Sequence, residues 1–169
     1  MLIQSKHFPE NMSYFQMGFK SVTVNVSDLA AMGATPLGFL LSIALPKDFE
    51  VDNFKQIIKG VLKACEYYDI SLIGGDTNEA SEIIISGTAL GLCDSPLMKN
   101  TSKKGDLVVL TGKIGLAALG FNLEDKNIYT KKALEPIAKI KEGINIKNAG
   151  GTSATDITCL LYTSPSPRD

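Results

Sequence analysis

Two aspartates stand in sequence settings that suit the handling of a metal ion or a phosphate. The first, Asp28, lies within the segment 25–36, Asn-Val-Ser-Asp-Leu-Ala-Ala-Met-Gly-Ala-Thr-Pro, where a helix is expected to end. A carboxylate in the last turn of a helix meets the negative end of the helix dipole, which is unfavourable unless a cation compensates it. The setting of Asp28 therefore indicates a metal ion nearby.

The second aspartate, Asp76, follows two glycines at the end of a short apolar run. A Gly-Gly-Asp turn lets the backbone approach a ligand closely and exposes its N–H groups, while the aspartate adds a charge at the end of the strand. On its own such a turn is common. Its occurrence after the separate Asp28 motif favours a ligand site over a plain turn.

The element that positions Asp28 is a helix expected to run up to Met32. Its apolar residues recur at intervals of four, three, four and three, the pattern of a core-facing helix, at Phe15, Phe19, Val22, Val26 and Leu29. Asn11 or Ser13 can cap its start. Gly33 can take a left-handed backbone at its end, and Pro36 keeps the helix from resuming.

The residues that follow alternate between expected strands and helices. An apolar run at residues 38–45 predicts a buried strand, and residues 70–73 and 82–93 predict two more. Asp52 can cap a helix between the first two strands. The buried stripe of that helix is expected to comprise Phe54, Ile58, Val61, Leu62, Cys65 and Tyr68. Cys65 is expected to pack in the core and not to react.

A polar stretch at residues 94–105 is expected to separate two lobes. Beyond it, residues 106–110 predict a strand, and residues 111–115 predict a glycine-rich turn into a short apolar helix that ends near Phe121. Such a turn can present helix N–H groups to an anion, but it has neither the spacing of a P-loop nor the full dinucleotide motif. The remaining expected elements are a loop at residues 123–130 and a helix from Pro136 through Lys141.

The composition excludes several classes of partner. With 17 basic and 18 acidic residues, nothing predicts attraction to nucleic acid or to a membrane surface, and no apolar run approaches the length of a membrane span. Three cysteines without metal-ligand spacing, and no signal peptide, fit a reducing cytoplasm. A phosphate substrate must then be bound by local charges. The lysines of residues 94–105 form a solvated face, from which Lys99 could reach a phosphate.

Four segments together resemble the successive motifs of the thiamine-monophosphate kinase family, part of the superfamily of aminoimidazole ribonucleotide synthetase and selenophosphate synthetase. They lie at residues 24–36, 74–77, 105–112 and 155–158. The resemblance implies an α/β fold of the α+β type, with an aminoimidazole ribonucleotide synthetase-like amino-terminal domain that binds ATP and magnesium and dimerises through its sheet. The implied division is residues 1–96 for this domain, 97–158 for the start of a carboxy-terminal α/β domain, and 159–169 for a non-native tail.

The same resemblance assigns roles to individual residues. Asp28, Asp76 and Asp156 match aspartates that bind magnesium in the family. The implied ATP contacts are Gly75, Asp76, Lys99 and Thr158. Lys99 stands in place of an arginine, which keeps the charge but loses bidentate phosphate binding. His7, the only histidine, matches a residue that approaches thiamine monophosphate, although from its surroundings alone it is equally well a surface loop residue.

These assignments agree with the chemistry of carboxylates. Three carboxylates brought together would repel one another and raise their own pKa values unless cations neutralise them. Magnesium takes oxygen ligands and keeps several waters, so it suits a site to which phosphates also contribute. The expected reaction is in-line attack by an oxygen of thiamine monophosphate on the γ-phosphorus of ATP, giving thiamine pyrophosphate without a protein nucleophile.

The chain departs from the family pattern at both ends. An aspartate cluster of the family would precede Met1, and the pattern Asp-Ile-Ser-Asp-Gly-Leu fails at Cys159. We therefore expect a fragment, covering about half of a cytoplasmic, homodimeric enzyme. Two alternatives stay open: another ATP-dependent member of the superfamily, acting on a ribonucleotide or on selenide, and a non-catalytic dimeric binding protein.

Overall fold

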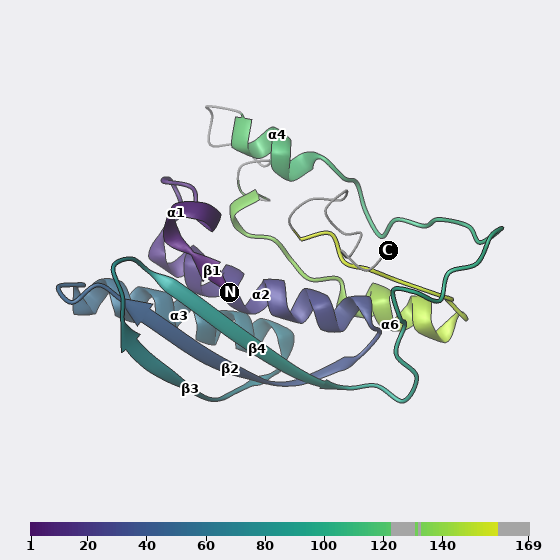
Figure 1. The fold of residues 1–169 in the computed structure, drawn as a ribbon, viewed down its shortest axis with the longest axis horizontal. Coiled ribbons are helices and arrows are strands. Elements are labelled where there is room, and N and C mark those ends of the chain that lie inside the picture. The colour runs from purple at the N-terminus through teal and green to yellow at the C-terminus, as the bar shows by residue number, and fades with distance from the viewer. Residues whose placement is uncertain (123–130, 132, 159–169) are drawn as a thin grey trace.

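The computed structural model describes residues 1–122, 131 and 133–158. In this part of the chain a four-stranded sheet carries two long helices, α2 and α3, on one face (Figure 1). The elements are β1 (Leu2–Ile3), α1 (Gln4–His7), α2 (Tyr14–Ala31), β2 (Thr35–Leu45), α3 (Val51–Tyr68), β3 (Ser71–Glu79), β4 (Ile84–Leu92), α4 (Leu116–Asn122) and α6 (Ile140–Asn148). The expectations for residues 123–130 and for the tail at 159–169 lie outside the described residues.

The sheet combines parallel and antiparallel neighbours. Its strand order is β1-β4-β2-β3, in which β2 and β3 run parallel while β4 runs antiparallel to both β1 and β2. The parallel pair is joined through α3, since parallel neighbours need a crossover connection along the length of the sheet. This architecture confirms the expected α/β fold of the α+β type.

α2 begins and ends as its sequence predicts. Ser13 is the N-cap residue, and the side chains of Ser13 and Gln16 each accept a hydrogen bond from the backbone N–H of the other, forming a capping box. Gly33, with φ of 68°, takes the left-handed backbone just beyond the helix. Pro36 lies in β2, which therefore follows the helix almost directly.

Two glycines let α2 and α3 pack at close range. A Cβ atom on Gly18 would lie 2.0 Å from the carbonyl oxygen of Ile57, and one on Gly60 would lie 1.9 Å from that of Phe15. The backbones of the two helices therefore touch. The core that α2 and α3 share with the sheet contains the fully buried apolar side chains of Val22, Val26, Phe39, Ile57, Val61, Ile83 and Ile85.

The start and the buried stripe of α3 differ from the prediction. The N-cap is Glu50, whose side chain makes no cap hydrogen bond, and Asp52 lies in the first turn. There the positive end of the helix dipole stabilises the carboxylate of Asp52, which also pairs with Nζ of Lys55 at 2.9 Å. The predicted core residue Leu62 is 50 % exposed. The observed buried stripe comprises Ile57, Gly60, Val61, Ala64, Cys65 and Tyr68.

The Gly-Gly-Asp segment lies inside a strand, so the predicted turn is wrong. β3 runs through it, and Gly74 and Gly75 pair with Leu40 and Leu41 of β2. A Cβ atom on Gly75 would lie 1.8 Å from the carbonyl oxygen of Leu41, so a side chain here would push the two strands apart. Close strand pairing therefore accounts for this glycine.

β2 is buried on one face only, although its continuous apolar run predicts burial on both faces. Phe39, Leu41 and Ile43 belong to the core beneath the helices. The opposite face of the sheet exposes apolar side chains that no described helix covers, namely Leu37, Ile73, Leu90 and Leu92. Among the described residues, no helix is long and apolar enough to cross a membrane.

Two expected elements in the second half of the chain are altered. Residues 106–110 do not form the expected strand, and the side chains of Leu107 and Val108 are almost fully exposed, because none of the described strands lies beside them to pair with. α4 confirms the expected short helix before residue 122. The helix expected from Pro136 begins instead at Ile140.

The described residues after 130 pack onto the helices of the first half. Leu134 is buried in the same core, and the side-chain amide of Gln16 donates to Glu135 at 2.9 Å. The backbone N–H of Ala138 donates to the hydroxyl of Tyr68 at 2.9 Å, so this segment is tied to α3 and does not continue into a helix at Pro136. The division between residues 96 and 97 stays a prediction.

Candidate functional site

Two of the predicted metal ligands, Asp28 and Asp156, come together at the carboxyl end of α2. Asp28 lies in the last turn of the helix, and Asp156 lies in the extended segment that follows α6. Ser27 links the two elements, because its hydroxyl donates to Oδ2 of Asp156 at 3.3 Å across 129 positions of sequence. The negative charge of Asp156 is close enough to raise the pKa of Asp28. The helix end therefore carries an acidic pair.

The pKa of Asp28 is raised above its usual value. The first cause is partial burial of the carboxyl group, and the second is the charge of Asp156. The ammonium of Lys99 acts in the opposite direction. Because burial and Asp156 outweigh it, the ionised form of Asp28 is under-compensated, and a bound cation would offset this.

Hydrogen bonds hold the segment that carries Asp156. The chain reverses after α6 at Gly150, whose φ is 83°. Beyond this reversal the Thr152 hydroxyl donates to Oδ2 of Asp106 at 2.6 Å, and the Ser153 hydroxyl donates to the carbonyl of Met98 at 2.7 Å. These bonds fasten residues 151–158, the returning segment, to the connection between β4 and α4. Asp156 is thereby brought to the end of α2.

Asp76 lies apart from the acidic pair. It is an exposed residue of β3 whose carboxylate accepts the backbone N–H of Thr77 at 2.9 Å. With Gly75 it lines a shallow hollow of about 520 Å³ on the edge strand of the sheet. The described ranges contain no group of three or more His, Cys, Asp or Glu side chains arranged to hold a metal ion. The structure thus brings two of the three predicted ligands together, and the metal role of Asp76 stays a prediction.

The other predicted contacts lie around α1 and α2. Lys99 is near enough to Asp28 to lower its pKa, and Thr158 is exposed at the end of the returning segment. His7 is half-buried in α1, where its Nδ1 accepts the backbone N–H of Ile3 at 3.0 Å. The same Nδ1 lies 3.3 Å from the carbonyl oxygen of Ile3, so the backbone of Ile3 can pair with either tautomer of the ring. His7 is therefore a helix residue, so the alternative of a surface loop residue is wrong, while its contact with the substrate stays a prediction.

A hollow of about 820 Å³ opens beside α1. Aromatic side chains from Phe8, Tyr14 and Phe15 line it together with the carboxylates of Glu10 and Glu82. Aromatic faces stack on flat rings and attract cations, and carboxylates add to that attraction. The hollow is therefore lined by aromatic and acidic residues, and Nζ of Lys20 lies 5.8 Å from the centroid of the Phe8 ring.

The amino-terminal part of the chain matches a known family. The family described as AIR synthase related protein, N-terminal domain, matches residues 1–93 of the 169 residues. The chain belongs to this family.

Curated relatives of this chain include several thiamine-monophosphate kinases. The relative from Pyrococcus horikoshii is 40 % identical over 163 residues, covering 94 % of this chain and 52 % of its own length. The relative from Methanocaldococcus jannaschii is 36 % identical, covering 85 % of this chain and 51 % of its own length. The chain spans about half the length of the curated relatives it matches.

Solved structures agree with the fold of this chain. Thiamine monophosphate kinase from Aquifex aeolicus is similar with a TM-score of 0.79 and 28 % identity, over 86 % of this chain and 53 % of that one. A structure of AaThiL complexed with AMPPCP and TMP has a TM-score of 0.80 and 28 % identity, over 86 % and 50 % of the two chains.

The donor set at the end of α2 fits a hard divalent cation. The carboxylates of Asp28 and Asp156 and the hydroxyl of Ser27 offer oxygen ligands, which are the ligands that magnesium prefers. Partial burial and then the charge of Asp156 raise the pKa of Asp28, and a cation between the two carboxylates would relieve their repulsion. Asp28 and Asp156 would therefore hold the ion, and water or phosphate oxygens would complete its coordination.

Sequence reasoning missed residues that help to build this site. Ser27 lies inside the first motif, beside Asp28, and that adjacency was the only signal for it. The ion pair between Lys147 and Asp94 gave no signal, because the two residues are 53 positions apart and meet only in the folded chain.

Replacing Asp28 by asparagine is expected to stabilise the metal-free chain at neutral pH. Because the pKa of Asp28 is higher in the folded than in the unfolded chain, its ionised form lowers the free energy of unfolding above that pKa, and this cost vanishes below the usual value of 3.8. Thermal unfolding with a chelator should show a higher Tm for Asp28→Asn than for the wild type at neutral pH and equal values in acid. A lower Tm for the variant at neutral pH would contradict the prediction.

Proposed function

We propose that this chain forms the amino-terminal half of a thiamine-monophosphate kinase, which transfers the γ-phosphate of ATP to thiamine monophosphate in a magnesium-dependent reaction. The proposal is carried by the match to curated thiamine-monophosphate kinases, which extends over 94 % of the chain at 40 % identity. The meeting of Asp28 and Asp156 supports it, because both residues lie in segments that resemble motifs of those kinases. The similar AaThiL structure with AMPPCP and TMP supports the choice of substrates.

In this proposal the residues of the chain bind and align the reactants. Asp28 and Asp156 hold the divalent cation, whose charge offsets the negative charge that develops on the transferred phosphoryl group. Lys99 adds a positive charge for the phosphates of ATP, and Gly75, Asp76 and Thr158 complete the proposed nucleotide contacts. No side chain bonds covalently to the phosphoryl group, because the phosphate oxygen of thiamine monophosphate is aligned for direct attack.

The hollow beside α1 is the proposed place for the rings of thiamine. Phe8, Tyr14 and Phe15 supply aromatic faces for the flat thiazolium ring, and the carboxylates in the hollow favour its positive charge. His7 precedes Phe8 directly, and its Nδ1 is already bonded to the backbone of Ile3. Nε2, the other ring nitrogen of His7, is the atom proposed to contact the substrate.

The activity is tested with a protein completed to the length of its relatives. Incubation with ATP, magnesium and thiamine monophosphate should yield thiamine pyrophosphate, and a chelator should stop the reaction. Good ATP binding without this product would overturn the proposal, and parallel assays with a ribonucleotide amidine and with selenide would then identify another member of the superfamily. Retained dimerisation without magnesium-dependent nucleotide binding would instead favour a binding protein.

We further propose that the protein is a cytoplasmic homodimer formed through the uncovered face of the sheet. The exposed side chains of Leu37, Ile73, Leu90 and Leu92 give this face an apolar surface that a second copy would bury. The unpaired thiols of Cys65 and Cys93 are compatible with a reducing compartment.

Replacing Leu90 by lysine is expected to convert the dimer to a monomer. Leu90 is 46 % exposed on the uncovered sheet face, and a lysine there would place an unpaired charge in the interface. Leu62, 50 % exposed on α3, supplies the matched control, because Leu62→Lys changes a similar side chain away from that face. Sedimentation of both variants and the wild type measures the effect. A Leu90→Lys protein that remains as dimeric as the control would contradict the proposed interface.

A further inference from the structure

The end of α2 that carries Asp28 is in close contact with α6. A Cβ atom on Gly143 of α6 would lie 1.9 Å from the carbonyl oxygen of Ala30, so the two helices touch backbone to backbone. One turn further along α6, the aliphatic stem of Lys147 covers Gly33, because a Cβ atom on that glycine would lie 2.8 Å from Cβ of Lys147. α6 therefore covers the last turn of α2 and the residue that ends it.

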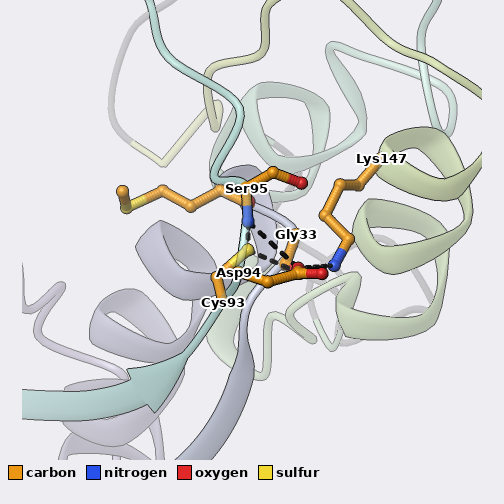
Figure 2. Close-up of polar contacts among 6 residues, drawn as sticks. Gly33, Cys93, Asp94, Ser95 and Lys147 are labelled. Carbon is orange, nitrogen blue, oxygen red and sulfur yellow. Dashed lines mark hydrogen bonds and ion pairs between the residues drawn. The ribbon is translucent and has the colours of Figure 1, made fainter.

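An ion pair ties α6 to the chain leaving β4. Nζ of Lys147 donates to Oδ1 of Asp94 at 2.9 Å (Figure 2). The preceding residue, Cys93, has its Sγ 3.6 Å from the carbonyl oxygens of both Met32 and Gly33. Lys147 is only 18 % exposed in its side chain although its partner is largely open to water. The end of α2 thus lies between α6 and the exit of β4.

The ion pair lies directly before the reversal that leads to Asp156. The N–H of Gly150 donates to the carbonyl of Lys147 at 3.0 Å, and the N–H of Gly151 donates to that of Ile146 at 2.9 Å. From this reversal the chain returns along the end of α2 to the hydrogen bond between Asp156 and Ser27. Lys147 therefore fixes the point from which the returning segment starts.

We propose that Lys147 is a positioning residue, which holds the returning segment so that Asp156 opposes Asp28. The Asp94 carboxylate is largely open to water, which limits what the ion pair contributes to the free energy of unfolding, so we assign the main effect of Lys147 to the placement of this segment. The effect on a bound cation rests on the function proposed above, whereas the effect on the segment does not.

Charge and position predict opposite effects when Lys147 is replaced by methionine. Removal of the positive charge of Lys147 makes the chain more negative, which would by itself strengthen cation binding. Loss of the anchor would weaken it, because Asp156 would no longer be held opposite Asp28. The sign of the change in affinity therefore separates positioning from simple electrostatics.

The test is a titration of the chain with Mn²⁺, which replaces magnesium. Binding is measured by calorimetry or from the spectrum of the free Mn²⁺ that remains in solution. Lys147→Met is expected to bind Mn²⁺ about tenfold more weakly, the lower end of the loss seen for supporting residues of metal sites. Lys139→Met is the matched control, because Lys139 lies at the start of the same helix and pairs with Glu142 at 3.2 Å. The double exchange Lys147→Asp with Asp94→Lys should recover part of the affinity.

A second measurement follows the segment without any metal. Amide hydrogen exchange at residues 149–158 should be faster in Lys147→Met than in the wild type, while exchange in α2 and α3 is unchanged. Asp94→Asn, which removes only the exposed partner, should show the same pattern if Lys147→Met does not fold.

Unchanged exchange at residues 149–158 in both variants, or Mn²⁺ binding by Lys147→Met as tight as that of Lys139→Met, would overturn the proposal. If the wild-type chain bound no Mn²⁺, the proposed cation site would fail. Faster exchange at residues 149–158 would in that case still support the positioning role of Lys147.

Discussion

A protein completed to the length of its relatives and carrying Asp28→Asn is expected to lose most of its magnesium-dependent turnover. The exchange removes the charge of a proposed direct ligand, so the loss should exceed the roughly 10- to 100-fold cost of removing a residue that only supports a ligand. Partial burial and the charge of Asp156 both act on the carboxyl group of Asp28. Asp28→Asn removes the charge of this group and therefore the repulsion that a bound cation would offset. Initial rates measured over a range of magnesium concentrations give the size of the loss.

The same variant separates function from stability. Asp28→Asn is expected to unfold at a higher temperature than the wild type at neutral pH, so reduced turnover would not come from unfolding. Asp52→Asn is the control, because Asp52 is an exposed aspartate that pairs only with Lys55 of its own helix. Near-normal turnover of Asp28→Asn, with the magnesium requirement of the control, would remove Asp28 from the proposed site.

Replacing Gly60 by alanine is expected to lower the free energy of unfolding by about 2 to 3 kcal/mol, the upper range for overpacking a tight contact. Helix propensity alone predicts the opposite sign, since alanine is favoured over glycine inside a helix by about 1 kcal/mol. The new Cβ atom would lie 1.9 Å from the carbonyl oxygen of Phe15, which is backbone and cannot rotate away. α2 and α3 must therefore separate, and denaturant unfolding measures the cost.

Gly112→Ala is the control for this prediction. Nothing lies within 4 Å of a Cβ atom built on Gly112, and its backbone is outside the region that requires glycine. This control should be neutral or slightly stabilising, because alanine restricts the unfolded chain. A stabilised Gly60→Ala protein would show that the two helices can move apart without loss and that their close crossing is not required.

Features governed by local sequence were predicted well. The spacing of apolar residues in α2, the cap at Ser13 and the left-handed Gly33 depend on neighbours within one or two helical turns. The alternation of strands and helices and the motif around Asp28 were enough to reach the fold. The same motif placed Asp28 correctly at the end of its helix.

Features governed by distant partners were not predictable in this way. Gly75 looks like a turn residue, yet the backbone of Leu41 in a neighbouring strand is what excludes a side chain there. The apolar run of β2 predicts burial, but whether a second layer covers the sheet depends on elements far away in sequence. The expected strand at residues 106–110 has a suitable composition and lacks a neighbouring strand in the described part of the chain. The pairing of Lys147 with Asp94 likewise exists only after α6 has docked.

The long sequence separation between Ser27 and Asp156 has a consequence for the order of events during synthesis. The two residues are 129 positions apart, so a ribosome making about 5 to 20 residues per second completes α2 many seconds before Asp156 exists. Apart from Leu134, the buried residues of the core that joins α2, α3, β2, β3 and β4 are all made by position 92. A nascent chain therefore passes through a stage in which the scaffold has collapsed while the acidic pair is still unmade, and a cation can bind there only late in translation.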